Sequence, residues 1–128
     1  MSLLLDTRLV LWAAIAPARL SPAVRAAIDD PATDIWFSVA SLWEIAIKAA
    51  RRRADFDVDP RRLRRGLLDH DWRELAITGA HALALDDLPP LHKDPFDRML
   101  LAQAKTEGLT LLTADALVAQ YPGKVRKV

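Results

Sequence analysis

The chain has 128 residues, of which 52% are hydrophobic and 27% are charged, a balance typical of one globular domain. It contains no cysteine, which excludes a disulfide framework, thiolate metal ligands and a cysteine nucleophile. Its four glycines lack the spacing of a phosphate-binding loop, which excludes a dinucleotide-binding fingerprint and a P-loop. The net charge of +1 gives no indication of a polyanionic partner. We expect a single domain over residues 1–128.

The apolar segments predict neither a membrane span nor a secretion signal. The longest uncharged apolar run, residues 9–18, is too short to cross a bilayer. No basic region precedes an apolar stretch at the N-terminus. We therefore expect a soluble cytoplasmic protein without a membrane partner.

Strand and helix signals alternate along the chain. In chain order we predict a strand over residues 3–5, helices over 8–16 and 21–28, a strand over 35–39, helices over 41–53 and 61–70, a strand over 72–78, helices over 81–85 and 94–107, a strand over 109–112, a helix over 114–120 and a small terminal strand over 124–128. The strongest strands are apolar throughout, which is typical of strands covered on both faces. The alternation predicts an α/β fold with a mostly parallel sheet and helices on both of its faces.

The residues that follow the strands carry the functional prediction, because ligands bind at the carboxyl edge of a parallel sheet. Asp6 and Asp115 come after the strands at 3–5 and 109–112, and Glu44 lies one turn into the helix after the strand at 35–39. Asp97 lies in the first turn of the longest helix. Clustered carboxylates stay ionised only if a cation compensates their charge. Oxygen ligands favour Mg²⁺ or Mn²⁺, which can activate water for phosphodiester hydrolysis.

Each acid at this edge also has a structural interpretation, which the sequence leaves open. The structural interpretations are N-caps at Asp6 and Asp94, a helix-dipole contact at Asp97, a capping turn at Asp115 after Thr113, and for Glu44 either a capping box with Ser41 or an ion pair with Lys48.

Two observations favour function at these positions. Glu44 interrupts the apolar stretch 42–47, and Asp97 shares a helical face with Leu101 and Ala104, which must face the sheet. The same helical phase places Asp94 on the polar side with Arg98, where it acts as a cap.

Four segments carry a family resemblance. They read LLDT at residues 4–7, SVASLWEIAIK at 38–48, HKDPFDRMLLAQA at 92–104 and LLTAD at 111–115. In this order they resemble the PIN-domain family and, more narrowly, the VapC-type toxins of bacterial toxin–antitoxin pairs. The second and third segments are specific motifs, whereas the first and last are weak on their own.

The resemblance implies a three-layer α/β/α sandwich and a Mg²⁺- or Mn²⁺-dependent endoribonuclease that acts as a toxin on RNA. It also implies a VapB-like antitoxin as partner and a homodimer. Carried over by position, the catalytic and metal-binding acids are Asp6, Glu44, Asp97 and Asp115, with Asp94 as an accessory residue. Thr7 and Thr113 are further accessory candidates, because a hydroxyl at a strand end can bond a carboxylate or a phosphate.

Two positions depart from the family pattern. Arg8 stands where relatives usually carry His, and Ala114 stands where many carry Arg or Asn. Neither change removes a predicted metal ligand, but both would alter contacts with substrate. A dehalogenase-like phosphoryl transferase needs a second Asp at position 8, and a receiver domain needs paired acids after its first strand; neither is present. The alternative function is a catalytically weak PIN-like domain that binds RNA or protein.

A basic segment and several apolar residues are candidates for partner contacts. Seven arginines fall between Arg51 and Arg65, where they form a solvated face, a track for RNA phosphates or a docking surface for the antitoxin. Either a dimer interface or core burial explains the apolar residues Leu9, Leu11, Trp12 and Ile15.

The remaining aromatic and histidine residues are assigned mostly to structure. Trp12, Trp36 and Trp43 are expected in the core or a dimer interface, whereas Trp72 is expected to be partly exposed. His81 is expected on a short surface helix, and contact of His92 with substrate is a secondary interpretation.

Overall fold

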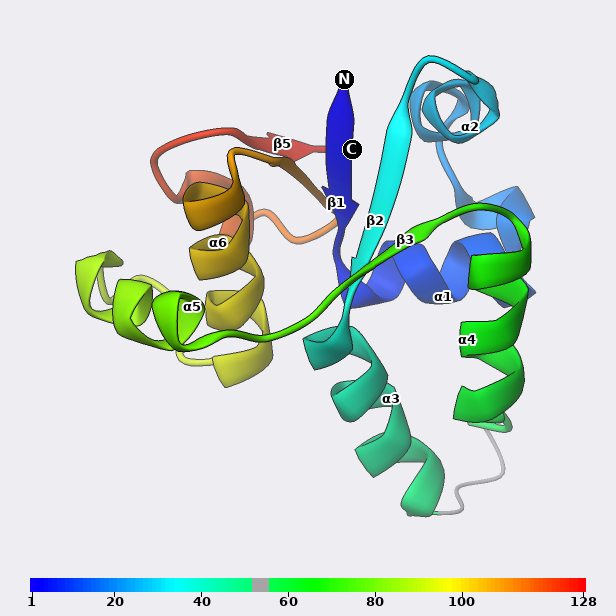
Figure 1. The fold of residues 1–128 in the computed structure, drawn as a ribbon, viewed down its shortest axis with the longest axis horizontal. Helices are drawn as coiled ribbons and strands as arrows, with labels where there is room; N and C mark the ends of the chain where they lie inside the picture. Colours follow the sequence, from blue (N-terminus) through cyan, green and yellow to red (C-terminus); the bar gives the residue numbers. More distant parts are fainter. Residues whose placement is uncertain (52–55) are drawn as a thin grey trace.

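The structure is a computed structural model that describes residues 1–51 and 56–128, which form a five-stranded sheet between two layers of helices (Figure 1). The strands are β1 (Ser2–Leu5), β2 (Asp34–Ser38), β3 (Arg73–Leu75), β4 (Thr110–Thr113) and β5 (Val125–Lys127). Their order is β3-β2-β1-β4-β5, and every neighbouring pair is parallel. The predicted three-layer α/β/α sandwich is therefore confirmed, with a sheet that is parallel throughout.

The helices cover both faces of the sheet and one of its edges. They are α1 (Thr7–Ile15), α2 (Pro22–Asp29), α3 (Val39–Ala50), α4 (Pro60–Asp69), α5 (Gly79–Ala84) and α6 (Pro95–Glu107), with short 3-10 helices η1 (Pro17–Arg19), η2 (Leu85–Asp87) and η3 (Val118–Gln120). Helices α1, α2 and α4 pack on one face, and α6 packs on the other with α5 against it. Helix α3 continues from β2 at the carboxyl edge and contacts α1, α4 and α6. Within the described ranges, no helix is long and apolar enough to cross a membrane.

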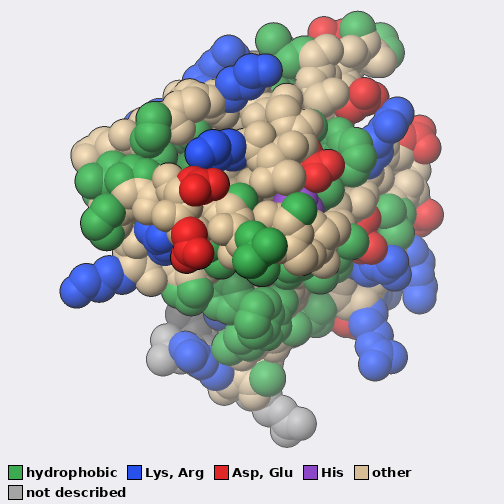
Figure 2. All heavy atoms as spheres, turned by 60° about the vertical axis from the view of Figure 1, so that its left-hand side comes forward, with side chains coloured by type: hydrophobic (Ala, Val, Ile, Leu, Met, Phe, Trp, Pro, Cys, Tyr) green, Lys and Arg blue, Asp and Glu red, His purple; other side chains and the backbone are tan. Residues whose placement is uncertain are grey.

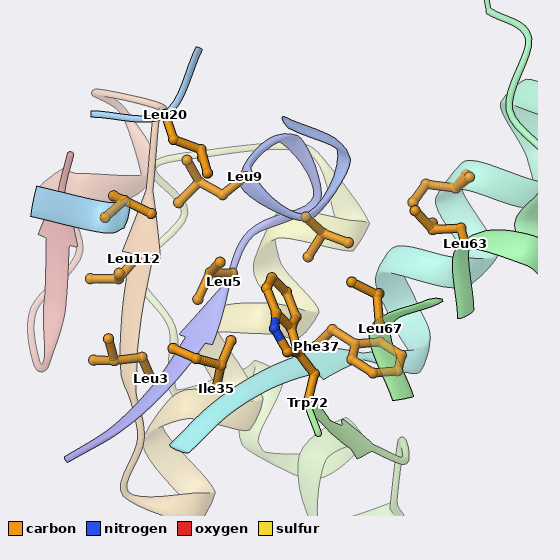
Figure 3. Close-up of a cluster of buried hydrophobic side chains, with 13 residues drawn as sticks. Leu3, Leu5, Leu9, Leu20, Ile35, Phe37, Leu63, Leu67, Trp72 and Leu112 are labelled. Atoms are coloured by element: carbon orange, nitrogen blue, oxygen red, sulfur yellow. The ribbon is translucent and has the colours of Figure 1, made fainter. Parts of the chain in front are cut away.

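Two hydrophobic cores form because alternate side chains of a strand point to opposite faces. Leu3 and Leu5 of β1 join the core beneath α1, α2 and α4, whereas Leu4 joins the core beneath α6. Figure 3 shows the first core, where side chains of α4 lie beside the sheet. All three leucines are at most 2% exposed, and burial of each contributes roughly 1.5–3 kcal/mol to the free energy of unfolding.

Three predicted elements differ from the observed ones. The strand expected over 72–78 is limited to β3, and the helix expected over 114–120 is reduced to η3. The second difference arises because the Asp115 carboxylate accepts the backbone N–H groups of Leu117 and Val118 and holds a capping turn there. Helix α3 begins at Val39 rather than at the predicted residue 41, because Ser38 caps the helix: its hydroxyl accepts the N–H of Ala40 at 2.9 Å.

Three sequence predictions about single side chains are wrong. Trp72 is only 8% exposed, because a left-handed residue at Asp71 (φ 63°) turns the chain after α4 and directs Trp72 into the core. His81 lies on α5 as predicted, but its side chain is fully buried. Trp43 is 59% exposed, so core burial, one of the two placements predicted for it, is wrong, and the dimer-interface placement stays a prediction. Residues 52 and 53, the end of the helix predicted over 41–53, lie outside the described residues.

Candidate metal centre

A cleft of about 270 Å³ opens at the carboxyl edge of the sheet. Its lining residues are Asp6, Thr7, Arg8, Leu11, Glu44, Lys48, His92, Asp94, Asp97 and Asp115. The structure thus brings together the four acids predicted from the sequence, although they come from segments as far apart as β1 and the turn after β4. Asp94 and Thr7 share the cleft, and Thr113 lies behind it in contact with Asp6.

Asp6 is held firmly at the end of β1. One carboxylate oxygen accepts the N–H of Leu9 at 2.9 Å and caps α1; the other accepts the Thr113 hydroxyl at 2.7 Å and the N–H of Ala114 at 3.0 Å. The predicted cap at Asp6 is therefore present, and the same carboxylate links β1 to the end of β4. Desolvation by burial raises the pKa of Asp6, although these hydrogen bonds oppose the shift.

Thr7 lies beside Asp6 and contributes to packing between two helices. Its hydroxyl donates to the Ser41 hydroxyl at 2.9 Å, and both side chains are buried. Ser41 therefore lies inside α3 and anchors it to α1, so the predicted capping box from Ser41 to Glu44 is wrong.

Glu44 projects from the first half of α3 into the cleft. Its Oε2 lies 3.3 Å from Lys48 Nζ, which confirms the predicted ion pair one turn along the helix. Its Oε1 is buried and, within the described part of the chain, has no hydrogen-bond partner. A buried carboxylate oxygen without a partner costs free energy unless a ligand supplies one.

Asp94 and Asp97 sit at the beginning of α6 in different roles. Asp94 caps the helix by accepting the N–H groups of Phe96 at 2.8 Å and Asp97 at 3.1 Å, as predicted. Asp97 points into the cleft, as its phase with Leu101 predicted. Asp94 also lines the cleft, so its separation from Asp97 is smaller than the helical phase indicated.

His92 is a residue of the cleft to which sequence reasoning gave only a secondary role, contact with substrate. Its Nε2 lies 2.8 Å from Asp97 Oδ2, and its backbone N–H donates to the hydroxyl of the buried Tyr121 at 2.8 Å. Arg98 also donates to that hydroxyl, at 3.3 Å. The position of His92 in the HKDPFD segment, five residues before Asp97, was the one available signal.

Three side chains offer ligand atoms close enough to share an ion. One atom each from His92, Asp97 and Asp115 lies within 4.8 Å of the others. In the described ranges, neither Asp6 nor Glu44 belongs to this group, although both line the same cleft.

The cleft makes ionisation of its central acid unfavourable. Burial raises the pKa of Asp97 to about 6, and the nearby charges of Asp94 and Glu44 act in the same direction, whereas the hydrogen bond from His92 opposes it. A bound cation would reverse this balance, because it favours every ionised carboxylate around it.

The sequence matches the model of a known protein family along most of its length. The family model of the PIN domain matches residues 3–124, and the chain therefore belongs to the PIN-domain family.

Two solved structures are similar along almost the whole chain. One is a chain of VapBC2 from Rickettsia felis bound to a DNA fragment from its promoter, with a TM-score of 0.75, 13% identity, and coverage of 100% of this chain and 99% of that one. The other is a chain of DNA-bound VapBC from Salmonella typhimurium, with a TM-score of 0.70, 16% identity, and coverage of 99% and 98%. At such low identity the likeness shows a shared fold. No curated protein matches the sequence.

Proposed function

We propose that the protein is a VapC-type toxin, a Mg²⁺- or Mn²⁺-dependent endoribonuclease that hydrolyses RNA phosphodiester bonds. The observation that supports this most is the cleft of a PIN-domain protein in which five carboxylates gather at the carboxyl edge of the sheet. Lys48 and Arg8 compensate only part of that negative charge.

The donor set fits a hard divalent cation. Carboxylate oxygens dominate the cleft, and Glu44 Oε1 is a buried oxygen that lacks a partner within the described part of the chain. In this proposal Asp6, Glu44, Asp97 and Asp115 hold the ion, directly or through water. When bound, such an ion supplies an activated water and neutralises charge that develops on the phosphate.

Several residues of the chain fix the positions of the metal-binding carboxylates and of the RNA. Thr113 and the N–H groups of Leu9 and Ala114 fix the Asp6 carboxylate, so it needs no rearrangement to bind a cation. Asp94 fixes the first turn of α6 and with it the direction of Asp97. Arg8 is exposed at the rim of the cleft, where its guanidinium can pair with an RNA phosphate.

Cleavage of a single-stranded RNA pool tests the activity. We expect cleavage with Mn²⁺ or Mg²⁺, none with excess chelator, and recovery when metal is restored. Metal at 100 times its dissociation constant should also raise the free energy of unfolding by about 2.7 kcal/mol, because it binds the folded protein and not the unfolded chain. RNA binding that persists in chelator, with no cleavage at any metal concentration, would favour the alternative function of a binding module.

We further propose a VapB-like antitoxin as partner. The two similar structures are VapBC complexes, and an antitoxin arginine would pair well with the acidic cleft. Expression of this protein alone in the cytoplasm of a bacterial host should stop growth of the host, and co-expression of the antitoxin should restore growth. Normal growth with abundant soluble protein would count against the toxin.

The arginine segment has more than one role. Arg64 makes a two-pronged contact with Glu74, at 2.6 and 3.1 Å, so it fastens α4 to β3. Arg61, Arg62 and Arg65 are exposed on the same helix. Arg52 and Arg53 lie outside the described residues. RNA phosphates and the antitoxin remain the two candidate partners of these exposed arginines.

We also propose a homodimer through α3 rather than α1. On α1, Leu9 belongs to the core and Leu11 and Trp12 pack against it, so that helix exposes only Ile15 of the four candidates. Helix α3 instead exposes an apolar stripe at i, i+3, i+4 and i+7, formed by Trp43, Ala46, Ile47 and Ala50. Figure 2 shows hydrophobic side chains gathered low on this face, at the height of α3 in Figure 1. An antiparallel pair of α3 helices would bring Arg51 of one copy towards Glu44 of the other.

Sedimentation at several concentrations tests the dimer. Trp43→Glu should give a monomer, whereas Leu83→Glu on the exposed face of α5 should leave the dimer intact. A monomeric wild-type protein at micromolar concentration would contradict the proposal.

A further inference from the structure

The predicted donor set of the cleft contains oxygen only, but the structure adds a nitrogen. His92 Nε2 and the carboxylates of Asp97 and Asp115 place one ligand atom each within 4.8 Å of the others. Two neighbouring ligands of an octahedral ion, each about 2.1 Å from it, lie about 3.0 Å apart. The observed 2.8 Å between His92 Nε2 and Asp97 Oδ2 matches that spacing.

The backbone that carries the His92 imidazole is held in place by the protein before any ion binds. The backbone of His92 donates to the Tyr121 hydroxyl, and Tyr121 is only 4% exposed. Arg98 fixes the same loop by donating to the carbonyl oxygens of Leu85 and Pro89 as well as to Tyr121. Binding through His92 would therefore cost little backbone conformational entropy.

From these contacts we infer that His92 is a direct nitrogen ligand of the divalent ion, together with Asp97 and Asp115. The inference rests on the proposed metal-dependent function and departs from its oxygen-only ligand set. In the metal-free protein a proton bridges Nε2 and Asp97 Oδ2; the ion takes its place and the proton passes to solvent.

A nitrogen ligand changes which ion the cleft prefers. Mg²⁺ takes almost only oxygen ligands, whereas Mn²⁺ belongs to the first-row transition series and accepts a nitrogen ligand more readily, although it is the weakest binder of that series. The protein should therefore bind Mn²⁺ more tightly than Mg²⁺, by a margin that depends on His92.

A competing role for His92 is to orient Asp97 through the hydrogen bond without touching the ion. His92→Gln separates the two roles, because the glutamine amide can still donate to Asp97 but has no ring nitrogen. His70→Gln is the matched control, since His70 is exposed directly after the end of α4 and does not line the cleft.

The experiment is electron spin-echo spectroscopy of Mn²⁺ added to metal-stripped protein, with dissociation constants for Mn²⁺ and Mg²⁺ measured on the same samples. The wild type and His70→Gln should show the nitrogen-14 modulation of a coordinated imidazole, and His92→Gln should lack it. The preference for Mn²⁺ over Mg²⁺ should fall about tenfold in His92→Gln alone. Thermal melting would show that each variant is folded.

The remaining outcomes separate this inference from the proposed function. Tight Mn²⁺ binding without nitrogen modulation in the wild type would overturn the inference but leave a metal-dependent nuclease. Modulation that persists in His92→Gln would overturn it as well, because another nitrogen would be the ligand. Absence of any Mn²⁺ binding would overturn both proposals.

Discussion

Two histidine–carboxylate pairs of similar length occupy opposite kinds of surroundings. His81 Nε2 lies 3.0 Å from Glu107 Oε2, and His92 Nε2 lies 2.8 Å from Asp97 Oδ2. His81 is fully buried between α5 and α6, whereas the His92 side chain is 19% exposed at the edge of the acidic cleft. The distance within such a pair is therefore a poor guide to its function, which depends instead on the groups that surround the pair.

Both ring nitrogens of His81 have hydrogen-bond partners. Its Nδ1 accepts the N–H of Thr78 at 3.1 Å and completes a capping box at the start of α5. Gln103 lies beside the ring and also accepts the hydroxyl proton of Ser38, the residue that caps α3. The pair thus ties α5, α6 and the end of β2 together, and among the described residues no carboxylate cluster lies next to it.

The neighbours of His92 leave charge uncompensated. Asp97 is surrounded by Asp94, Glu44 and Asp115 as well as by His92. Free energy is lost in holding these acids together, and a bound cation recovers it. The comparison therefore predicts that changes at the His92 pair alter activity and changes at the His81 pair alter stability.

The largest expected effect is loss of cleavage in Asp97→Asn. The substitution removes a charged ligand while keeping the size and the hydrogen-bonding ability of the side chain, so RNA cleavage should fall by at least about 1,000-fold. Glu107→Gln, which alters the carboxylate of the other pair, is the matched control and should leave cleavage within about threefold. Comparable losses in both variants would remove the functional distinction between the pairs.

The next largest effect is on stability, and it falls on the other histidine. His81→Ala leaves a cavity and the N–H of Thr78 without its acceptor, so the free energy of unfolding should drop by about 2–4 kcal/mol. His92→Ala should cost less than about 1 kcal/mol, because the side chain is partly solvated and its backbone bond to Tyr121 remains. Urea unfolding of the metal-free proteins measures both values, and an equal cost would contradict the comparison.

A smaller effect concerns pH in the metal-free protein. The folded pKa of Asp97 is about 6, above its ordinary value of 3.8, so the folded state keeps the proton over a range in which the unfolded chain releases it. The free energy of unfolding therefore falls progressively as the pH rises from about 4 to about 6, and above that pH the whole penalty for ionising Asp97 is present. Asp97→Asn removes this penalty. It should be more stabilising at pH 7.5 than at pH 4.5 by about 1–2 kcal/mol, because partial solvation reduces the full shift. Unfolding measured at both pH values, with Glu107→Gln as control, tests the sign.

Much of the fold could be predicted because short-range signals agree with the tertiary structure. Leu3–Leu5 and residues 109–112 are apolar throughout, and Pro22 and Gly108 mark a helix start and a helix end that the structure shows. The carboxyl-edge rule then placed Asp6, Glu44 and Asp115 at one edge of the sheet, and the helical phase of Asp97 directed the fourth acid towards them.

What could not be predicted depends on contacts between distant segments. The burial of Trp72 results from a left-handed residue at Asp71, and the burial of His81 results from α6, which begins 14 residues later in sequence. The contact of His92 with Asp97 depends on Tyr121, which no local pattern connects to the acidic turn. The sequence could not decide between core and interface for Trp43, because α3 carries apolar residues on two faces.

The smallest effect separates the two acids that begin α6, which the sequence alone nearly confuses. Asp94→Ala removes the cap that accepts the N–H groups of Phe96 and Asp97, at a cost of about 1 kcal/mol. Ser21→Ala is the matched control, because Ser21 also caps a helix that begins with proline, at α2, away from the cleft lining. Both variants should lose a similar amount of stability.

Their effects on cleavage should differ. Loss of the Asp94 cap loosens the turn that aims Asp97, so cleavage should fall by several-fold but stay measurable, whereas Ser21→Ala should cleave as the wild type does. Asp94 also contributes negative charge that raises the pKa of Asp97, and its removal makes Asp97 easier to ionise, which limits the loss. Cleavage rates and melting temperatures of Asp94→Ala, Ser21→Ala and Asp97→Asn decide the assignment. An inactive Asp94→Ala beside an active Asp97→Asn would show that Asp94 holds the ion and that Asp97 serves the helix, although it is Asp97 that touches His92.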